Sequence, residues 1–207
     1  MDVPMFQKKL HDINPPLDDD LVQREYGAFG KARELFEAED AKAAGIVFLD
    51  DGTHRFALAN GGLLTVYASP YTAFRAGSLS LFAAVARARP SMHCFGHIHE
   101  AWGAKRVTWR SEISETPSHF TDINNDESTV IGTLAGLRQS KFDSTDDAAA
   151  KEKKRMEYND VGYCTANSTP KRGTQTLFVN AAIESLIEEE QQWPWMVSID
   201  LPRLVEG

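Results

Sequence analysis

The chain has 207 residues and a net charge of −8 at neutral pH, with 42% hydrophobic and 25% charged residues. This length and composition are typical of one globular domain with a buried core, or of one domain plus a long insertion. The negative charge argues against a general nucleic-acid binder, which needs a basic face to neutralise phosphates. It favours a neutral small substrate, or an anionic one that a bound cation neutralises.

Cysteine content and hydropathy bear on the cellular compartment. Cys94 and Cys164 are too few for a disulfide framework and favour a reducing environment. The start of the chain lacks the apolar core of a signal peptide. No stretch approaches the roughly 18 apolar residues that a membrane-spanning helix needs. We therefore expect a cytoplasmic protein with no membrane partner, and leave open whether it has a protein partner.

The first elements predicted are an irregular arm and a helical region. Residues 1–18 contain three prolines and predict the arm. The three aspartates at 18–20 supply an N-cap and a negative first turn for a helical stretch over residues 21–44. Gly27 and Gly30 are expected to divide or weaken that helix.

Short strands are predicted next. Residues 46–49 are continuously apolar, and residues 54–59 alternate in part. Asn60-Gly61 is a strong hairpin signal, so residues 62–68 are expected to pair with the preceding strand.

The middle of the chain predicts one helix and two strands. Residues 77–89 have the spacing of an amphipathic helix, which Pro90 ends. Residues 92–95 predict a buried strand, and residues 104–109 predict its partner strand.

Residues 111–173 are polar and show no strand periodicity, which predicts a flexible surface insertion. Within it, a charged helix is expected to start near Ser144 and to run to about Tyr158. Strands resume at residues 176–180 and 196–201. The predicted class is α/β (α+β).

The residues that point to chemistry directly follow the strand at 92–95. The run Gly96-His97-Ile98-His99-Glu100 places two histidines two residues apart at the end of that strand. Residues i and i+2 of an extended chain point the same way, and neutral imidazole is a common metal ligand. His97 and His99 are therefore candidate metal ligands, although a pair of hydrogen-bonded surface histidines fits the same spacing.

Residues 87–103, RARPSMHCFGHIHEAWG, resemble the final Gly-His-x-His motif of the calcineurin-like metallophosphoesterases, and most closely their small metallophosphoesterase-domain branch. Other stretches resemble that branch in the same order: SPYT at 69–72, TLFVNAA at 176–182 and WMVSIDLP at 195–202. The resemblance covers residues 11–109 and 174–204 in pieces.

This resemblance implies a partial metallophosphoesterase-type β-sandwich flanked by helices, as a single, incomplete domain over residues 1–207. It implies metal-dependent hydrolysis of small-molecule phosphate mono- or diesters by a dinuclear centre of Mn, Fe or Zn ions. By the same resemblance, His97 binds one metal and His99 the other. The same resemblance implies that His11 is the catalytic residue, as a proton donor or phosphate-orienting group, although Lys9 and Leu10 stand where the family has Gly and Asn and an exposed histidine of the arm fits the sequence as well.

The chain departs from the family pattern in its carboxylates. The Asp-x-His and Gly-Asp-x-x-Asp motifs do not occur, so the bridging aspartate is missing, and a further block is expected to be lost near Phe74-Arg75. Two dications about 4 Å apart repel by roughly 16 kcal/mol at an effective dielectric of 20, which two imidazoles do not offset. We therefore expect impaired hydrolysis. The alternative is a non-catalytic remnant that acts as a binding or interaction module. Skipped exons and a degenerate paralogue both fit these gaps.

Other polar residues carry weaker expectations. Glu100 could orient a ligand histidine or be a solvated acid. Asn180 could hydrogen-bond across the site, although a structural role is favoured. His93 is expected in the core or an interface, and His54 and His119 are assigned no role.

Overall fold

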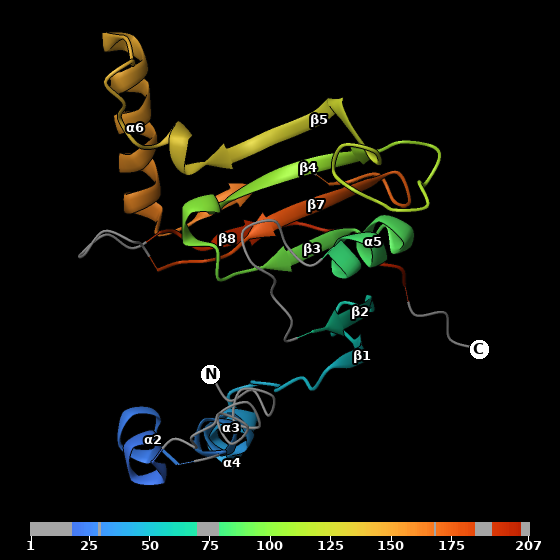
Figure 1. The fold of residues 1–207 in the computed structure, drawn as a ribbon, viewed down its shortest axis with the longest axis vertical. Helices are drawn as coiled ribbons and strands as arrows, with labels where there is room; N and C mark the ends of the chain where they lie inside the picture. Colours follow the sequence, from blue (N-terminus) through green and yellow to red (C-terminus); the bar gives the residue numbers. More distant parts are fainter. Residues whose placement is uncertain (1–17, 29, 70–78, 168, 185–191, 204–207) are drawn as a thin grey trace. The chain divides into compact units, whose positions relative to one another are not determined.

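The computed structural model describes residues 18–28, 30–69, 79–167, 169–184 and 192–203. The chain forms two compact units, residues 1–70 with 202–207, and residues 71–201. Both contain helices and strands, so the coarse prediction of a mixed α and β protein is confirmed (Figure 1). None of the helices in the described ranges is long and apolar enough to cross a membrane.

The first unit begins with three short helices: α2 (Asp19–Tyr26), α3 (Lys31–Glu37) and α4 (Glu39–Ala43). The predicted cap is confirmed, because the Asp18 carboxylate accepts hydrogen bonds from the backbone N–H groups of Asp20 and Leu21. Gly27 and Gly30 both adopt positive φ angles, of 78° and 77°. This backbone conformation ends α2 and separates it from α3, which is how the glycines divide the predicted helix.

A hairpin follows, built from β1 (Gly52–Ala57) and β2 (Leu63–Ala68) in antiparallel register. Its turn matches the prediction, because the Asn60 side chain accepts from the N–H of Gly62. The strand predicted at residues 46–49 is wrong: this segment is irregular and Val47 is 62% exposed. A short apolar run alone does not provide the neighbouring strand that a ladder requires.

The second unit is built on a four-stranded sheet in the order β3-β7-β4-β5. These strands are β3 (Met92–Phe95), β4 (Gly103–Trp109), β5 (Ile123–Thr133) and β7 (Gln175–Asn180). β3 is parallel to β7, and β4 is antiparallel to both of its neighbours. The strand beside β3 is therefore β7, and not residues 104–109 as predicted. Apolar patterning locates a strand but does not select its neighbour.

Helix α5 (Leu79–Ala88) covers one face of this sheet, and its existence was predicted. Val85 and Ala86 of α5 pack with Val107 and Trp109 of β4 in one buried cluster. The amphipathic spacing of α5 thus places its apolar side on the sheet.

A second sheet packs on the opposite face. It pairs β6 (Cys164–Ala166) with β8 (Trp195–Val197) in parallel. Ala166 packs there with Leu177 and Val179 of β7, whose side chains alternate with those facing α5. The second unit therefore has α5, the four-stranded sheet and the two-stranded sheet as successive layers.

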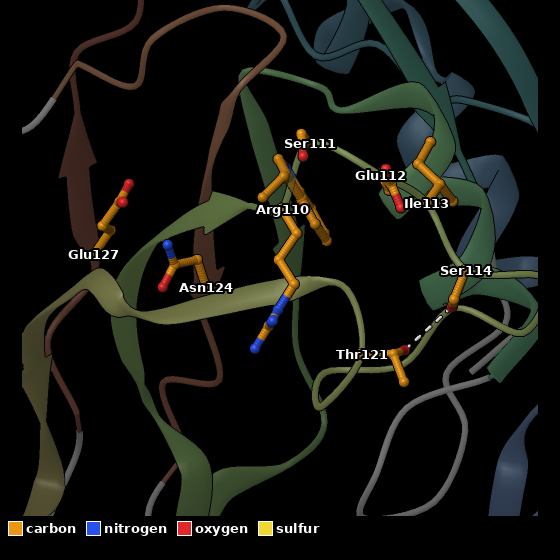
Figure 2. Close-up of a pocket in the computed structure, with 9 residues that line it drawn as sticks. Arg110, Ser111, Glu112, Ile113, Ser114, Thr121, Asn124 and Glu127 are labelled. Atoms are coloured by element: carbon orange, nitrogen blue, oxygen red, sulfur yellow. Dashed lines mark hydrogen bonds between the residues drawn. The ribbon is translucent and has the colours of Figure 1, made fainter.

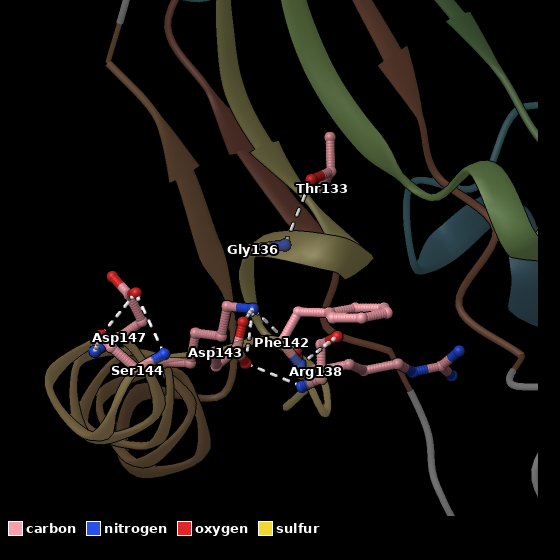
Figure 3. A network of polar contacts seen from close by, with 9 residues as sticks. Thr133, Gly136, Arg138, Phe142, Asp143, Ser144 and Asp147 are labelled. Carbon is pink, nitrogen blue, oxygen red and sulfur yellow. Dashed lines mark hydrogen bonds and ion pairs between the residues drawn. The ribbon is translucent and has the colours of Figure 1, made fainter.

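Residues 111–173 differ from the prediction of a segment without strands, because they contain β5, β6 and helix α6 (Thr145–Val161). β5 is the outer strand of its sheet and most of its side chains are exposed, so its sequence carries little apolar alternation. The predicted helix is confirmed, with Ser144 and Asp147 forming a capping box at its start (Figure 3).

An ion pair attaches α6 to the segment after β5. The Lys151 ammonium lies 2.7 Å from the Asp143 carboxylate and donates to the carbonyl of Arg138. Cys164, just beyond α6, is buried, whereas Cys94 is exposed, and both are free thiols. The sequence predicted Cys94 in a buried strand and Cys164 in a polar loop. The reverse is found, because β3 is an edge strand and residue 164 belongs to β6.

Asp122 is a buried carboxylate that orders the loop between β4 and β5. It accepts hydrogen bonds from the N–H groups of Ser114 (2.9 Å) and Ser118 (3.0 Å), and from the hydroxyls of Ser114 and Thr121. Burial acts to raise the pKa of Asp122, but these donors stabilise its charged form and lower the pKa to about 2. The shape of the loop therefore depends on an ionised Asp122.

We expect acid to destabilise the chain through Asp122. Its pKa is about 2 in the folded chain and about 3.9 when unfolded, so its contribution is complete above about pH 4 and is lost as the pH falls towards 2. This loss amounts to about 2 kcal/mol. Urea unfolding of the parent and of Asp122→Asn at several pH values measures it. The variant should be less stable at neutral pH and respond less to acid, and identical acid responses would contradict the assignment.

Candidate metal-binding site at the carboxyl ends of β3 and β7

The segment that contains both candidate histidines begins where two parallel strands end together. Phe95, the last residue of β3, pairs with Asn180, the last residue of β7. The chain then continues through Gly96 into a short 3-10 helix, η1 (His99–Ala101). Loops at the carboxyl ends of parallel strands commonly form ligand sites, which makes this edge the candidate site.

His97 has an unusual backbone conformation. Its φ of 73° is positive, which among described non-glycine residues occurs only here and at Arg89. The left-handed region costs an L-residue roughly 1 kcal/mol or more, although histidine tolerates it better than most. Because the chain turns at His97, the i/i+2 rule used to predict that both rings point the same way does not apply here.

His99 is held by its ring. Its Nδ1 lies 2.6 Å from the backbone carbonyl oxygen of Glu184. A carbonyl oxygen only accepts, so Nδ1 carries a hydrogen, and in the neutral imidazole Nε2 then has the lone pair. Metal-binding histidines commonly have this arrangement, with one ring nitrogen donating to a carbonyl and the other available to the metal.

Two buried amides fix the backbone of the same loop. Asn180 donates from Nδ2 to the carbonyl of Ile98 at 2.6 Å and accepts from the N–H of Ala182. Gln192 donates from Nε2 to the carbonyl of His99 at 3.1 Å. Asn180 is 2% exposed and Gln192 6% exposed. Asn180 thus has a structural contact with the loop, and Gln192 carried no sequence signal that singled it out.

The other predicted residues lie outside this hydrogen-bonded group. His93 packs between the rings of Phe95 and Phe178, at centroid distances of 5.4 and 5.1 Å, and burial lowers its pKa. His93 is thus half-buried among aromatic side chains of the edge strand β3 and its neighbour, at the margin of the core in which it was expected. Glu100 lies exposed in η1. His11 falls outside the described residues.

The donor set limits what metal the site could hold. Among the described residues, no group of three or more histidine, cysteine, aspartate or glutamate side chains is placed to hold a metal ion. A dinuclear centre needs ligands that serve and bridge both ions, and these donors do not fit one. Imidazole is nevertheless a suitable ligand for a single borderline cation such as Zn²⁺, for which His97 and His99 would supply part of the coordination shell and water the rest.

A separate hollow of about 650 Å³ lies at the far end of β4 (Figure 2). Its lining includes Trp109, Arg110 and Thr121. Because β4 begins beside Asn180 and ends at Trp109, this hollow and the histidine loop lie at opposite ends of the sheet. No predicted site residue lines it.

Comparison with protein-family models, with characterised proteins and with solved structures finds no match to this chain. The resemblance of the histidine segment to a known motif therefore stays an expectation. The case for function has to rest on the geometry of that segment.

We expect glycine to be tolerated better than alanine at position 97. Glycine adopts positive φ without a steric penalty, so His97→Gly should be more stable than His97→Ala by about 1 kcal/mol. Urea unfolding midpoints at equal slope measure the difference. His119, which does not have positive φ, provides the control pair, and there glycine should not exceed alanine. An alanine variant as stable as the glycine variant at position 97 would show that the strain is absent.

Proposed function

We propose that this chain is a metal-dependent phosphoesterase-like hydrolase of low activity, in which His97 and His99 bind one divalent cation. The observation that carries the proposal is the 2.6 Å contact between Nδ1 of His99 and the carbonyl of Glu184, which leaves Nε2 available. The resemblance of residues 96–100 to the last calcineurin-like metallophosphoesterase motif supplies the substrate class, a small phosphate mono- or diester. Mn, Fe and Zn are the candidate cations.

The electrostatics of the chain favour a cation in this role. A bound divalent ion would supply Lewis-acid stabilisation of charge on a phosphoryl oxygen. With a net charge of −8, the chain repels an anionic phosphate ester unless positive charge is added at the site. The chain's own contribution is to hold the imidazoles of His97 and His99. His11 remains the proposed proton donor.

The fold is compatible with this proposal at the level of layers. The family implies two packed sheets with helices outside, and the second unit has two packed sheets with α5 on an outer face. A partial metallophosphoesterase-type sandwich is therefore the finer fold that we propose.

A second candidate is a non-catalytic module that binds one metal weakly. It is favoured by the absence, from the described residues, of a third histidine, cysteine or carboxylate grouped with the two histidines. Such a site would bind an ion through few protein donors and would not turn over a phosphate ester.

We expect one metal ion per chain, bound through both histidines. Calorimetric titration with Zn²⁺ or Mn²⁺ should give one site in the parent and about tenfold or greater loss of affinity in His97→Ala and His99→Ala, which corresponds to about 1.4 kcal/mol. His119→Ala, which removes an exposed histidine elsewhere, should bind as the parent does. Equal affinities in all four proteins would refute ligation by these histidines, and two tightly bound ions would refute the single-ion site.

Hydrolysis separates the two candidates. With Mn²⁺ and an aryl phosphate ester, a hydrolase should exceed the metal-only background, lose this rate in His97→Ala and keep it in His119→Ala. If the parent and His97→Ala hydrolyse the ester equally, the hydrolase is excluded and the binding module remains.

A further inference from the structure

Gln192 combines burial with an unpaired oxygen. It is 6% exposed, yet its Oε1 has no hydrogen-bond donor among the described residues. A buried acceptor without a partner costs about 1–3 kcal/mol. Exchanging the amide oxygen and nitrogen does not relieve this, because Oε1 would then face the carbonyl oxygen of His99, and both atoms are acceptors. The amide orientation is therefore fixed by the bond from Nε2 to His99.

Gln192 is itself rigidly held. Its backbone N–H donates to the carbonyl of Ile183 at 2.8 Å. The carbonyl of the next residue, Trp193, accepts from Nε1 of Trp102 at 3.0 Å. Trp102 is 1% exposed and stacks on Trp195 at a centroid distance of 4.8 Å. The side chain of Gln192 therefore extends from an anchored backbone.

Gln192 reaches His99 by two routes. Its side chain donates to the backbone carbonyl of His99. Its backbone N–H donates to the carbonyl of Ile183. Glu184, which follows Ile183, provides the carbonyl that accepts from Nδ1 of His99. The backbone and the ring of His99 are thus both fixed from the neighbourhood of one residue.

The backbone carbonyl of His99 does not depend on the amide of Gln192 for a hydrogen-bond donor. The carbonyl of His99 also accepts from the backbone N–H of Trp102 at 3.3 Å, so it keeps a partner when Gln192 is replaced. A methionine has nearly the same shape and would bury no unpaired oxygen. For stability alone the amide brings little. Because Gln192 bonds to both His99 and Ile183, its amide fixes how the backbone of His99 lies relative to the Glu184 carbonyl that accepts from Nδ1.

We propose that Gln192 is a positioning residue, which holds His99 in the tautomer that protonates Nδ1 and leaves Nε2 as a donor to a cation. The role of the cation rests on the proposed function, but the tautomer can be measured without metal. Gln192 acts through His99 and need not touch the ion.

The first experiment compares parent and Gln192→Met by histidine nitrogen NMR in the metal-free chain, at about pH 8, above the ordinary imidazole pKa of about 6.5. His99 should be the Nδ1–H tautomer in the parent and a mixture in the variant, while the unfolding midpoint is unchanged or higher. A merely structural role would leave the His99 tautomer of the variant unchanged and lower its unfolding midpoint. An Nε2–H tautomer in the parent, or an unchanged tautomer in the variant, would overturn the proposal. If Gln192→Met does not fold, Gln192→Leu takes its place, because leucine also removes the amide and should give the same mixture of tautomers.

Gln175→Met provides the matched control. Gln175 is half-buried at the other end of the sheet, where its amide donates to Thr108 and accepts from the N–H of Lys171. This variant removes the same group and should leave the His99 tautomer as in the parent. A shift in both variants would show a general effect of loosening the sheet and would overturn a specific role for Gln192.

Zinc titration then relates the tautomer to the metal. Gln192→Met should bind Zn²⁺ about tenfold more weakly than the parent, and Gln175→Met should bind as the parent does. If the parent binds no zinc while the tautomer result holds, the proposed function fails and the positioning of His99 stands. If zinc affinity is equal in parent and Gln192→Met, positioning does not contribute to the site and the proposal fails.

Discussion

The parallel pairing of β3 with β7 is the interaction on which the candidate site depends. It aligns the last residues of both strands, Phe95 and Asn180, at one edge of the sheet. From that edge Asn180 reaches the carbonyl of Ile98, and the chain beyond β7 provides the carbonyl of Glu184 to His99. β7 also contributes to both apolar faces of the sheet, with Phe178 towards α5 and Leu177 and Val179 towards the β6-β8 sheet. Loss of this register would therefore separate the histidine segment from the Asn180 and Glu184 side of the site.

Local signals predicted local structure. The cap at Asp18, the Asn60 turn and the capping box at Ser144 all depend on contacts a few residues apart, and the structure contains each of them. The errors concern contacts distant in sequence. Residues 46–49 form no strand, because an apolar run does not by itself provide a neighbouring strand to pair with. β5 is an outer strand, and because most of its side chains are exposed it lacks the alternation of apolar and polar residues by which a strand is recognised.

In the candidate site too, some features could be predicted from the sequence and others depend on the fold. The spacing of His97 and His99 at the end of a strand could be interpreted from sequence, because it involves side chains with a known chemistry. The Glu184 carbonyl could not, since any residue presents a carbonyl and only the fold decides where it lies. Gln192 could not be found from the sequence either, because two glutamines after an acidic segment form no recognisable motif. The positive φ of His97 also arises from how the loop is held at both ends.

Two features of this loop lower the stability of the folded chain, and their location is relevant to the function of the loop. The left-handed His97 costs roughly 1 kcal/mol and the unpaired oxygen of Gln192 about 1–3 kcal/mol, whereas the buried carboxylate of Asp122 is fully hydrogen-bonded. Such costs concentrate where binding shapes a structure more than stability does. A ligand present at about a hundred times its Kd stabilises the folded state by about 2.7 kcal/mol, whatever that Kd is. A cation at that ratio of concentration to Kd would offset most of the two costs, which together amount to about 2–4 kcal/mol, so the modest donor set and the strained loop are consistent with a single binding site.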